Sequence, residues 1–400
     1  MKAFICIILF ASVMGDEWIK PVPLIEANST VRHFDIYVDG NGYNHIALCI
    51  EKVNDIGDVS QELAYIKIDN YLNKKTIPIT SGCRVVKIFG VNERRTLVIA
   101  FEGKRRLDMG VCNSTYKEGC YDIFTTYSTD FGERWSRAIQ IRRNDQNDAV
   151  DRFNPHLGYI KPYNIMVLLY TMKPASLTSL RINFVKTKLD RPDFSGEMNV
   201  AASIDGKLLD LLVLNYDKTP ECHVFFEDQG KVKHKFYIYD NPWIEAKEIN
   251  TADERYTRIL STEKNLTSLV AIYTNGTHSF AKLSLDKGEN WNISVKISDE
   301  YHKYATGILD IKSGNVYELT LLTTGFMNKK LSFKTVNLMD GKIETLASPF
   351  TNTSLYGIFM PQLIPSKKQG LPYKAFGHIW GNKTYPDIYV SEYSNSSQWT

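Results

Sequence analysis

Length, composition and charge already exclude several classes of protein. The chain has 400 residues, of which 43% are hydrophobic, 12% aromatic and 23% charged, and its formal net charge is +3. That profile is typical of a folded globular protein and argues against a disordered chain and against a nucleic-acid partner. The length fits two or three average domains or one large all-β domain. Because 23 Tyr and 19 Phe accompany 24 Gly and 14 Pro, we expect mostly strands joined by turns.

Residues 1–15 are typical of a secretory signal peptide. Met1 and Lys2 precede an apolar run of about a dozen residues, AFICIILFASVM, and Gly15 lies just ahead of Asp16. A membrane-spanning helix needs about 20 apolar residues, and no later segment reaches that length. The C-terminal sequence, SEYSNSSQWT, is too polar for a lipid-anchor signal. We therefore expect a secreted, extracellular protein with no membrane span.

Glycosylation sequons support export. Eight N-x-S/T sequons occur, each of which needs an exposed position to be used. They lie at Asn28, Asn113, Asn265, Asn275, Asn292, Asn352, Asn382 and Asn395. Their density is typical of a secreted glycoprotein, although a chain rich in Asn, Ser and Thr produces several by chance.

The cysteines predict a disulfide and an odd thiol. Cys6 leaves with the signal peptide, so that an odd number of cysteines remains. Cys112 and Cys120 flank a short polar loop and are the first choice for a disulfide. Cys49 with Cys83 is the second choice, and Cys222 is then unpaired. None of these spacings resembles a zinc site, and no P-loop or dinucleotide motif occurs, so we expect neither a metal nor a cofactor.

Two octads of one pattern indicate an internal repeat. STDFGERW spans Ser128 to Trp135 and SLDKGENW spans Ser284 to Trp291, so both read S-x-D-x-G-x-x-W. The spacing predicts a hairpin turn in which the Asp carboxylate accepts N–H bonds, the Gly takes a positive φ and the Trp folds back on the hairpin. An alternating apolar pattern follows each Trp and predicts a strand.

Weaker copies of this turn recur at a regular interval, around Asp190, Asp240 and Asp340 and in YVSEY near the C-terminus. The steps are about 60, 50, 46, 54 and 53 residues, each the length of a four-stranded antiparallel unit. Six such units predict an all-β, six-bladed β-propeller over residues 81–400, with seven blades as the alternative. The segment 16–80 is then left to supply outer strands that close the ring. A chance hairpin would explain one octad but explains the regular spacing poorly.

The octads are Asp boxes, and from about Ser81 the chain resembles the sialidase (neuraminidase) superfamily, above all the catalytic propeller of trypanosomal trans-sialidases. Asp boxes also occur in unrelated propellers, so the resemblance implies the fold and leaves the function to the site. In that family three arginines bind the carboxylate of the sugar acid, an Asp is the acid/base, and a Tyr activated by a Glu is the nucleophile. A guanidinium suits a carboxylate because it donates two parallel charged hydrogen bonds.

Four residues match parts of the family site by local context and in the family order. Arg84 in SGCRVVKIFG resembles the first arginine, and Asp108 in EGKRRLDMG lies where the acid/base belongs. Glu197 in SGEMNVAAS resembles the activating acid, and Tyr304 in HKYATGILD resembles the nucleophile. Each also has a structural explanation: a salt bridge for Arg84, a turn cap for Asp108, and satisfied positions in apolar strands for the other two. We expect the run at 104–106, KRR, to be a solvated face.

The other two family arginines are missing from the expected stretches, LLDLLVLNYDK and YTNGTHSFAKLSLDKGENW. Losing two charge-assisted partners, each contributing about 1.5 to 3 kcal/mol, would weaken binding of a sialate carboxylate by orders of magnitude. A glycan on Asn275 would also crowd the mouth of the site. A shifted blade alignment would leave four possible substitutes, which are Arg255, Arg258, Lys282 and His278.

Three hypotheses about function follow. The first is a secreted sialidase-like protein without turnover, which binds a sialylated glycan or a host or partner protein through its propeller face. The second is an active retaining exo-sialidase or trans-sialidase that uses the four matched residues. The third is an adhesive or structural propeller without pocket chemistry. We favour the first, because the arginine set is incomplete.

Overall fold

The computed structural model describes residues 17–18, 22–23, 29–53, 59–68, 74–104, 121–141, 150–174, 179–190, 194–216, 219–249, 255–261, 267–312, 316–325, 331–346, 357–365, 373–380 and 387–394. These segments are mostly strand, interrupted by two short 3-10 turns, η1 (Asn92–Arg94) and η3 (Lys161–Tyr163). The predicted all-β class is confirmed.

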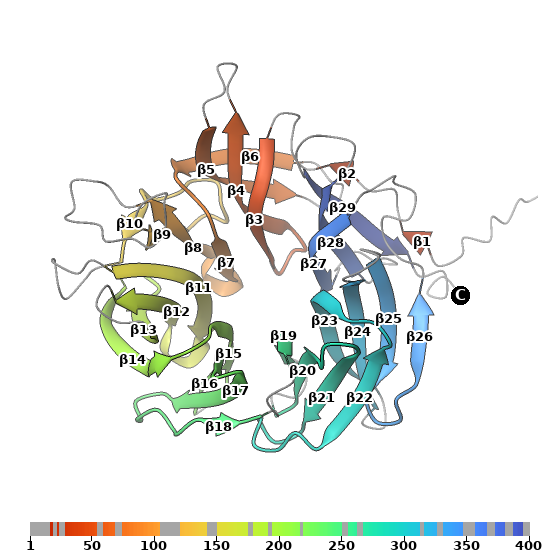
Figure 1. Ribbon diagram of the computed structural model, residues 1–400. Coiled ribbons are helices and arrows are strands. Elements are labelled where there is room, and N and C mark those ends of the chain that lie inside the picture. Colours follow the sequence, from red (N-terminus) through yellow and green to blue (C-terminus); the bar gives the residue numbers. More distant parts are fainter. Residues whose placement is uncertain are drawn as a thin grey trace, which may run out of the picture.

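The described strands form seven antiparallel sheets around one axis (Figure 1). Six have four strands: β3 (Ser29–Val38), β4 (Asn44–Val53), β5 (Val59–Ile68) and β6 (Lys74–Ser81); β7 (Val86–Val91), β8 (Thr96–Lys104), β9 (Tyr121–Ser128) and β10 (Ile139–Gln140); β11 (Val150–Ile160), β12 (Ile165–Pro174), β13 (Leu180–Lys188) and β14 (Ser195–Ile204); β15 (Leu208–Leu214), β16 (Glu221–Asp228), β17 (Lys231–Ile238) and β18 (Lys247–Glu248); β19 (Arg255–Ser261), β20 (Leu269–Thr274), β21 (Ser279–Ser284) and β22 (Ile293–Ser298); β23 (His302–Lys312), β24 (Val316–Gly325), β25 (Leu331–Asn337) and β26 (Ile343–Leu346). The remaining sheet, here called the closing sheet, contains β27 (Gly357–Pro365), β28 (Tyr373–Trp380) and β29 (Asp387–Ser394) together with β1 (Glu17–Trp18) and β2 (Val22–Pro23), which both pair with β29.

A propeller of four-stranded antiparallel blades is the predicted architecture, and six of the sheets have the predicted strand number. The acidic turn residues that mark the repeats in the sequence, from Asp130 to Asp340, each follow the third strand of a four-stranded sheet. The β3–β6 sheet carries no octad and was therefore not counted as a repeat, although its strands hydrogen-bond as fully as the others. With it the described ring has seven sheets, the alternative that the sequence left open.

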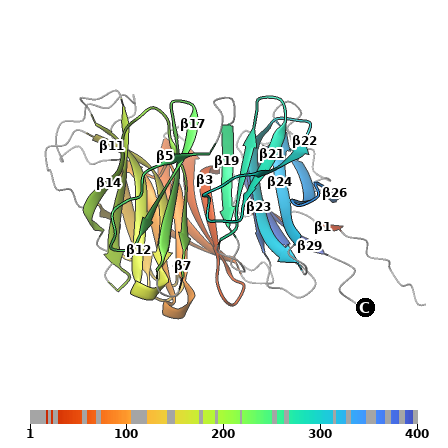
Figure 2. The ribbon, with the colours of Figure 1, turned by 90° about the horizontal axis from the view of Figure 1, so that it is seen from below.

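The order of strands fixes which residues can meet at the axis. The first strand of each sheet lies innermost, and the fourth strand of each four-stranded sheet lies outermost (Figure 1). Because neighbouring strands alternate in direction, the N-terminal ends of the first strands share one end of the ring with the loops between second and third strands. We call this the mouth end. The other end, here the turn end, carries the first-to-second and third-to-fourth turns (Figure 2).

The core lies between neighbouring sheets. The second strands are buried as nearly continuous runs: β8 (TLVIAFEGK) over its first eight residues and β20 (LVAIYT) over all six. A strand covered on both faces has no solvent-facing side, so its sequence loses the alternation of a half-exposed strand. The third strand β17 (KVKHKFYI) keeps much of that alternation. Val98 and Ile123 of one sheet thus pack with Leu168 and Tyr170 of the next.

Both octads form the turn geometry that their spacing predicts. In the first, Ser128 Oγ accepts the Gly132 N–H at 2.8 Å, and Asp130 Oδ1 accepts the Arg134 N–H at 2.9 Å. The second octad repeats both bonds, from Gly288 N to Ser284 Oγ and from Asn290 N to Asp286 Oδ1, each at 2.8 Å. Gly132 and Gly288 have φ values of 84° and 85°, which a side chain would strain.

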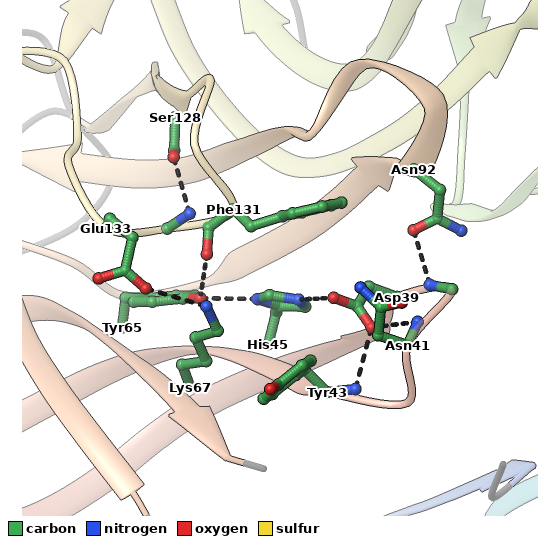
Figure 3. Close-up of polar contacts among 12 residues, drawn as sticks. Asp39, Asn41, Tyr43, His45, Tyr65, Lys67, Asn92, Ser128, Phe131 and Glu133 are labelled. Carbon is green, nitrogen blue, oxygen red and sulfur yellow. Dashed lines mark hydrogen bonds and ion pairs between the residues drawn. The ribbon is translucent and has the colours of Figure 1, made fainter.

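A buried relay of polar side chains ties the β3–β6 sheet to the first octad (Figure 3). Asp39 Oδ2 lies 3.2 Å from His45 Nε2, His45 Nδ1 lies 2.6 Å from the Tyr65 hydroxyl, and that hydroxyl lies 3.4 Å from the Phe131 carbonyl. A Cβ on Gly132 would collide with the Tyr65 hydroxyl, so the octad glycine is required for contact as well as for φ. The three relay side chains are at most 1% exposed, which makes the relay structural rather than catalytic.

A second relay of the same kind ties the β15–β18 sheet to the second octad. Glu221 Oε2 lies 3.1 Å from His223 Nε2, His223 Nδ1 lies 2.9 Å from His234 Nε2, and His234 Nδ1 lies 3.3 Å from the Gly288 carbonyl. Lys287 of the octad forms an ion pair with Glu221, in which Nζ lies 2.8 Å from Oε1. Burial, with a smaller contribution from His223, lowers the pKa of His234 to about 3.

The structure confirms the second of the two predicted disulfides and the unpaired thiol. Cys49 on β4 is bonded to Cys83, just before β7, which joins two neighbouring sheets. Cys222 is buried and unpaired, and burial raises the pKa of its thiol to about 12. Cys112 and Cys120 lie outside the described residues, as does the expected signal peptide. In the described part of the chain we find no helix with the length and apolar character to cross a membrane.

Candidate functional site

Arg84 lies at the mouth end, two residues before β7. Its Nε donates to Glu102 Oε2 at 2.7 Å, and its guanidinium lies over the ring of Tyr121, 4.1 Å from the centroid. Glu102, on β8, is 2% exposed, and its Oε1 accepts the Asn154 N–H at 2.6 Å. Burial raises the pKa of Glu102, although Arg84 and the Asn154 N–H oppose that shift. Arg84 is therefore held in place by a buried carboxylate and an aromatic face.

The contacts continue from Asn154 to the next two inner strands. The Asn154 side chain donates to the Leu208 carbonyl at 2.9 Å, at the start of β15. Two residues further on, Asp210 lies 3.7 Å from His156 Nδ1 through one oxygen and 3.7 Å from Arg258 Nε through the other. Burial alone would raise the pKa of Asp210, but Arg258 and His156 outweigh it and hold the pKa at about 2. Asp210 is thus a buried anion shared by two strands.

His156 and Lys87 complete the group of charges. Burial lowers the pKa of His156 against the pull of Asp210. Lys87, on β7, lies 3.8 Å from Asp35 on β3, whose other oxygen accepts the Ile88 N–H at 3.0 Å. We call seven residues that lie on, or just before, the first and second strands of neighbouring sheets the axial cluster: Asp35, Arg84, Lys87, Glu102, His156, Asp210 and Arg258. Each Lys or Arg in this cluster has a carboxylate partner.

The structure does not bring Glu197 and Tyr304 together. Glu197 is on β14, the outermost strand of its sheet, whereas Tyr304 is on β23, the innermost strand of another. Glu197 Oε1 accepts from the Tyr170 hydroxyl and, at 2.5 Å, from Asn183 Nδ2. Tyr170 is 1% exposed, and burial next to Glu197 raises the pKa of its phenol. In this pair Tyr170 is buried and Glu197 is half-buried, and both side chains are already engaged with each other.

The four possible substitutes for the missing arginines lie in different places. Arg258 is part of the axial cluster through Asp210. Arg255, at the start of β19, is exposed. Lys282 lies over the ring of Tyr273, 4.8 Å from its centroid, and His278 is hydrogen-bonded to Thr277 in the turn between β20 and β21. One arginine besides Arg84 therefore contributes to the axial cluster.

Some of the other predicted site residues lie in the part of the chain that the structure describes, and others lie outside it. Asn275 and Asn292 are described, and both are exposed. Asn275 is in a turn at the mouth end, where its side-chain oxygen accepts the His278 N–H at 3.0 Å. Outside the described residues lie Asp108, Asn28, Asn113, Asn265, Asn352, Asn382 and Asn395. Within the described residues, no three His, Cys, Asp or Glu side chains gather as metal ligands would.

Glu102 and Asp210 were missed as site residues, although the sequence carries a signal for each. Both are lone acids inside apolar strands, in LVIAFEGK and in LLDLLVL. A charged residue in such a run is rarely buried unless it is paired. Reading each acid as a buried ion-pair partner would have pointed to Arg84 and Arg258.

Solved structures share this fold at low sequence identity. NanB sialidase from Streptococcus pneumoniae aligns over 96% of this chain and 94% of its own, at 8% identity and a TM-score of 0.52. An α-L-arabinanase from Penicillium chrysogenum, solved with arabinobiose, aligns over 94% and 98%, at 10% identity and a TM-score of 0.51. A Dyadobacter fermentans protein of unknown function aligns over 96% and 100%, at 11% identity and a TM-score of 0.52.

No protein-family model and no curated protein sequence matches the chain. At such identities structural similarity defines the fold and leaves the chemistry to the site. The chain is a sialidase-like propeller.

Proposed function

We propose that this protein is a secreted glycoprotein that binds a sialylated glycan or a partner protein at the mouth end of its propeller, without cleaving it. One observation carries the proposal: Arg84 is held for binding by Glu102 and Tyr121, while Glu197 and Tyr304 lie on the outermost and innermost strands of different sheets. The residue matched to the family's first arginine is thus held in place, whereas the residues matched to its nucleophile and activating acid lie on different sheets.

The separation of Glu197 from Tyr304 argues against turnover. A tyrosine attacks a glycosidic carbon only if a nearby base takes up its phenolic proton, since its unperturbed pKa is near 10. Glu197 is already engaged by Tyr170 and Asn183. A nucleophile separated from Glu197 is expected to lose the general-base catalysis that Glu197 would contribute, about 10²- to 10⁴-fold in rate.

The setting of Arg84 supports binding. The side chain is 28% exposed, so it reaches solvent while Glu102 and Tyr121 limit its rotation. An arginine that is already ordered loses less conformational entropy when it binds a carboxylate. Glu102 also neutralises part of its charge, which favours a moderate rather than a very tight contact.

Export is supported by the sequence and by the surface. The signal-like residues 1–15, the sequons and the disulfide between Cys49 and Cys83 are all typical of an oxidising compartment. Asn275 and Asn292 are exposed, as glycosylation requires.

The test is glycan binding by the protein isolated after secretion. We expect a subset of sialylated glycans to bind on an array, and Arg84→Lys to weaken that binding about tenfold, because lysine loses the planar fork. Arg32→Lys is the matched control. Arg32 also pairs with a glutamate, Glu51, and both residues of this pair belong to the β3–β6 sheet. Thermal unfolding of each variant shows whether the fold is kept. Equal glycan binding by the wild-type and Arg84→Lys proteins would contradict the proposal for glycans.

A further inference from the structure

A groove of about 500 Å³ lies between two neighbouring sheets, and its described lining includes no residue of the axial cluster. Its walls come from the end of β6 and from β8, β9 and the segment that leads into β10. The volume is within the range of small-molecule sites, about 300 to 1,000 Å³. Gly82 lines it and is two residues from Arg84, so the groove opens beside the candidate site without including it.

The described lining of the groove is positively charged. It contains Lys104 and Arg137 and no Asp or Glu. Both cations are exposed, and the described part of the chain offers neither of them a carboxylate partner. In the axial cluster, by contrast, each Lys or Arg has a carboxylate within 4 Å. The groove is therefore electropositive, and its charge favours an anionic ligand.

The rest of the lining suits a ring with polar substituents. Phe101 and Phe124 stack with their centroids 5.6 Å apart and form an apolar wall. Thr80 and Ser81 at the end of β6 also line the groove, as does Gln140, whose Nε2 donates to Asp122 Oδ2 at 2.6 Å. Apolar faces with a few placed polar groups are typical of sites for small polar ligands.

Glycine at position 103 keeps this wall in place. A Cβ on Gly103 would lie 2.7 Å from Cδ2 of Phe124 and 3.2 Å from the Gly82 carbonyl, so a side chain there would displace the ring from the strand. Gly82 has a φ of +77°, which lets the chain turn at the end of β6. The two glycines thus shape the surface between the aromatic wall and the cations.

We infer that this groove is a second binding site, which takes an acidic sugar unit, a hexose ring that carries a carboxylate or a sulfate group. Lys104 and Arg137 bind the anionic group, and Phe124 packs against the ring. The sequence alone placed Lys104 in a solvated run, because it does not show that Arg137 lies across the same groove. The inference does not depend on what binds at the mouth end.

The test is isothermal titration of the secreted protein with three tetrasaccharides. One is heparin-derived and sulfated, one is a tetragalacturonate that carries carboxylates alone, and one is neutral cellotetraose. We expect at least one acidic probe to bind and cellotetraose not to bind. Which acidic probe binds distinguishes sulfate from carboxylate as the recognised group.

Variants locate the binding. Lys104→Gln and Arg137→Gln should each weaken binding of the acidic probe about tenfold, and the double variant should abolish it. Lys231→Gln is the control, because the Lys231 side chain is 42% exposed and pairs with Glu248 within the β15–β18 sheet, which does not line the groove. The affinity of this variant for the acidic probe should stay within about twofold of the wild-type value. Binding of neither acidic probe, or wild-type affinity in the double variant, would overturn the inference. Glycan binding that depends on Arg84 would stand in either case.

Discussion

The axial cluster and the groove use the same cationic residue types in opposite ways. Arg84 and Arg258 are paired with buried acids, whereas Arg137 in the groove has no carboxylate partner among the described residues. A buried carboxylate loses hydration and needs a cation, so Glu102 and Asp210 fix the arginines that face them. An exposed cation has no such constraint and stays available to a ligand.

This contrast shows how one fold can keep cations in structural ion pairs at one place and leave cations available to a ligand at another. At the axis, some ion pairs join the inner strands of different sheets, as the pair between Arg258 on β19 and Asp210 on β15 does. In the groove, removal of a cation leaves no buried partner behind. Substitutions at the axis should therefore act on stability first, and substitutions in the groove on binding first.

The largest expected effect is on folding, from Glu102→Gln. The change removes the partner of Arg84 and weakens the acceptor of the Asn154 N–H, both at a position that is 2% exposed. Arg84 is 28% exposed and is not left as a buried charge, so we expect the lost and weakened hydrogen bonds to lower the free energy of unfolding by about 1–3 kcal/mol. Urea denaturation measures it. Arg137→Gln, which touches no buried partner, should stay within about 0.5 kcal/mol of wild type. If the two variants unfold alike, the contrast between the regions is wrong.

Acid should reduce stability through the buried histidines. The pKa of His234 is about 3 and that of His302 about 4, both below the usual 6.5 because of burial. The unfolded chain takes up these protons as pH falls below about 6.5, while the folded protein resists them until pH nears those lower values. Stability is therefore lost as pH falls, by up to about 1.4 kcal/mol per pH unit for each histidine. Urea denaturation between pH 7 and 5 measures the slope.

His278 supplies the control for this slope, since its side chain is 37% exposed in a turn, far more than those of the two buried histidines. His234→Gln should flatten the pH dependence, and His278→Gln should leave it unchanged. Equal slopes in both variants would show that the buried relay does not carry the effect. Because the described lining of the groove contains no histidine and no carboxylate, binding there is best compared above about pH 6.5, before the buried histidines reduce stability.

Salt should produce the smallest effect, and it should do so mainly in the groove. Lys104 and Arg137 are exposed, so ions screen their attraction for an acidic sugar, and the Debye length shortens from about 10 Å at 0.1 M to about 3 Å at 1 M. We expect the affinity for the acidic probe to fall several-fold over that range. The stability difference between wild type and Glu102→Gln should change little, since buried pairs are screened less. Salt-independent binding of the acidic probe would argue against a charged groove.

The sequence predicted the fold because the residues that define the repeat are the ones that its turns require. The octad pattern requires Asp130 and Gly132 for local hydrogen bonds and a positive φ, and those needs are visible without any tertiary contact. The β3–β6 sheet has no such signature, and only its strand pairing reveals it. The disulfide between Cys49 and Cys83 likewise depends on two sheets meeting, which their separation of 34 residues in the sequence does not show.

The candidate site was less accessible to sequence reasoning. Arg84 was found because it lies beside a recognisable strand, but its partner Glu102 required knowledge of which acid faces it. Glu197 matched a family segment by local context, yet its place in the outermost strand follows from strand order within the sheet. The groove lies between segments of two sheets, among them the end of β6 and the segment that contains Arg137. A local sequence pattern does not show that these segments lie side by side.

Binding without cleavage is the central claim of this account, and release of a fluorophore from a sialic-acid glycoside tests it most directly. The secreted, glycosylated protein should be assayed beside Arg84→Ala and Tyr304→Phe, with an active sialidase as the positive control and circular dichroism to establish folding. The account predicts that folded wild-type protein releases no more fluorophore than buffer does. Turnover that both substitutions abolish would contradict it, because Tyr304 would then act as a nucleophile without Glu197.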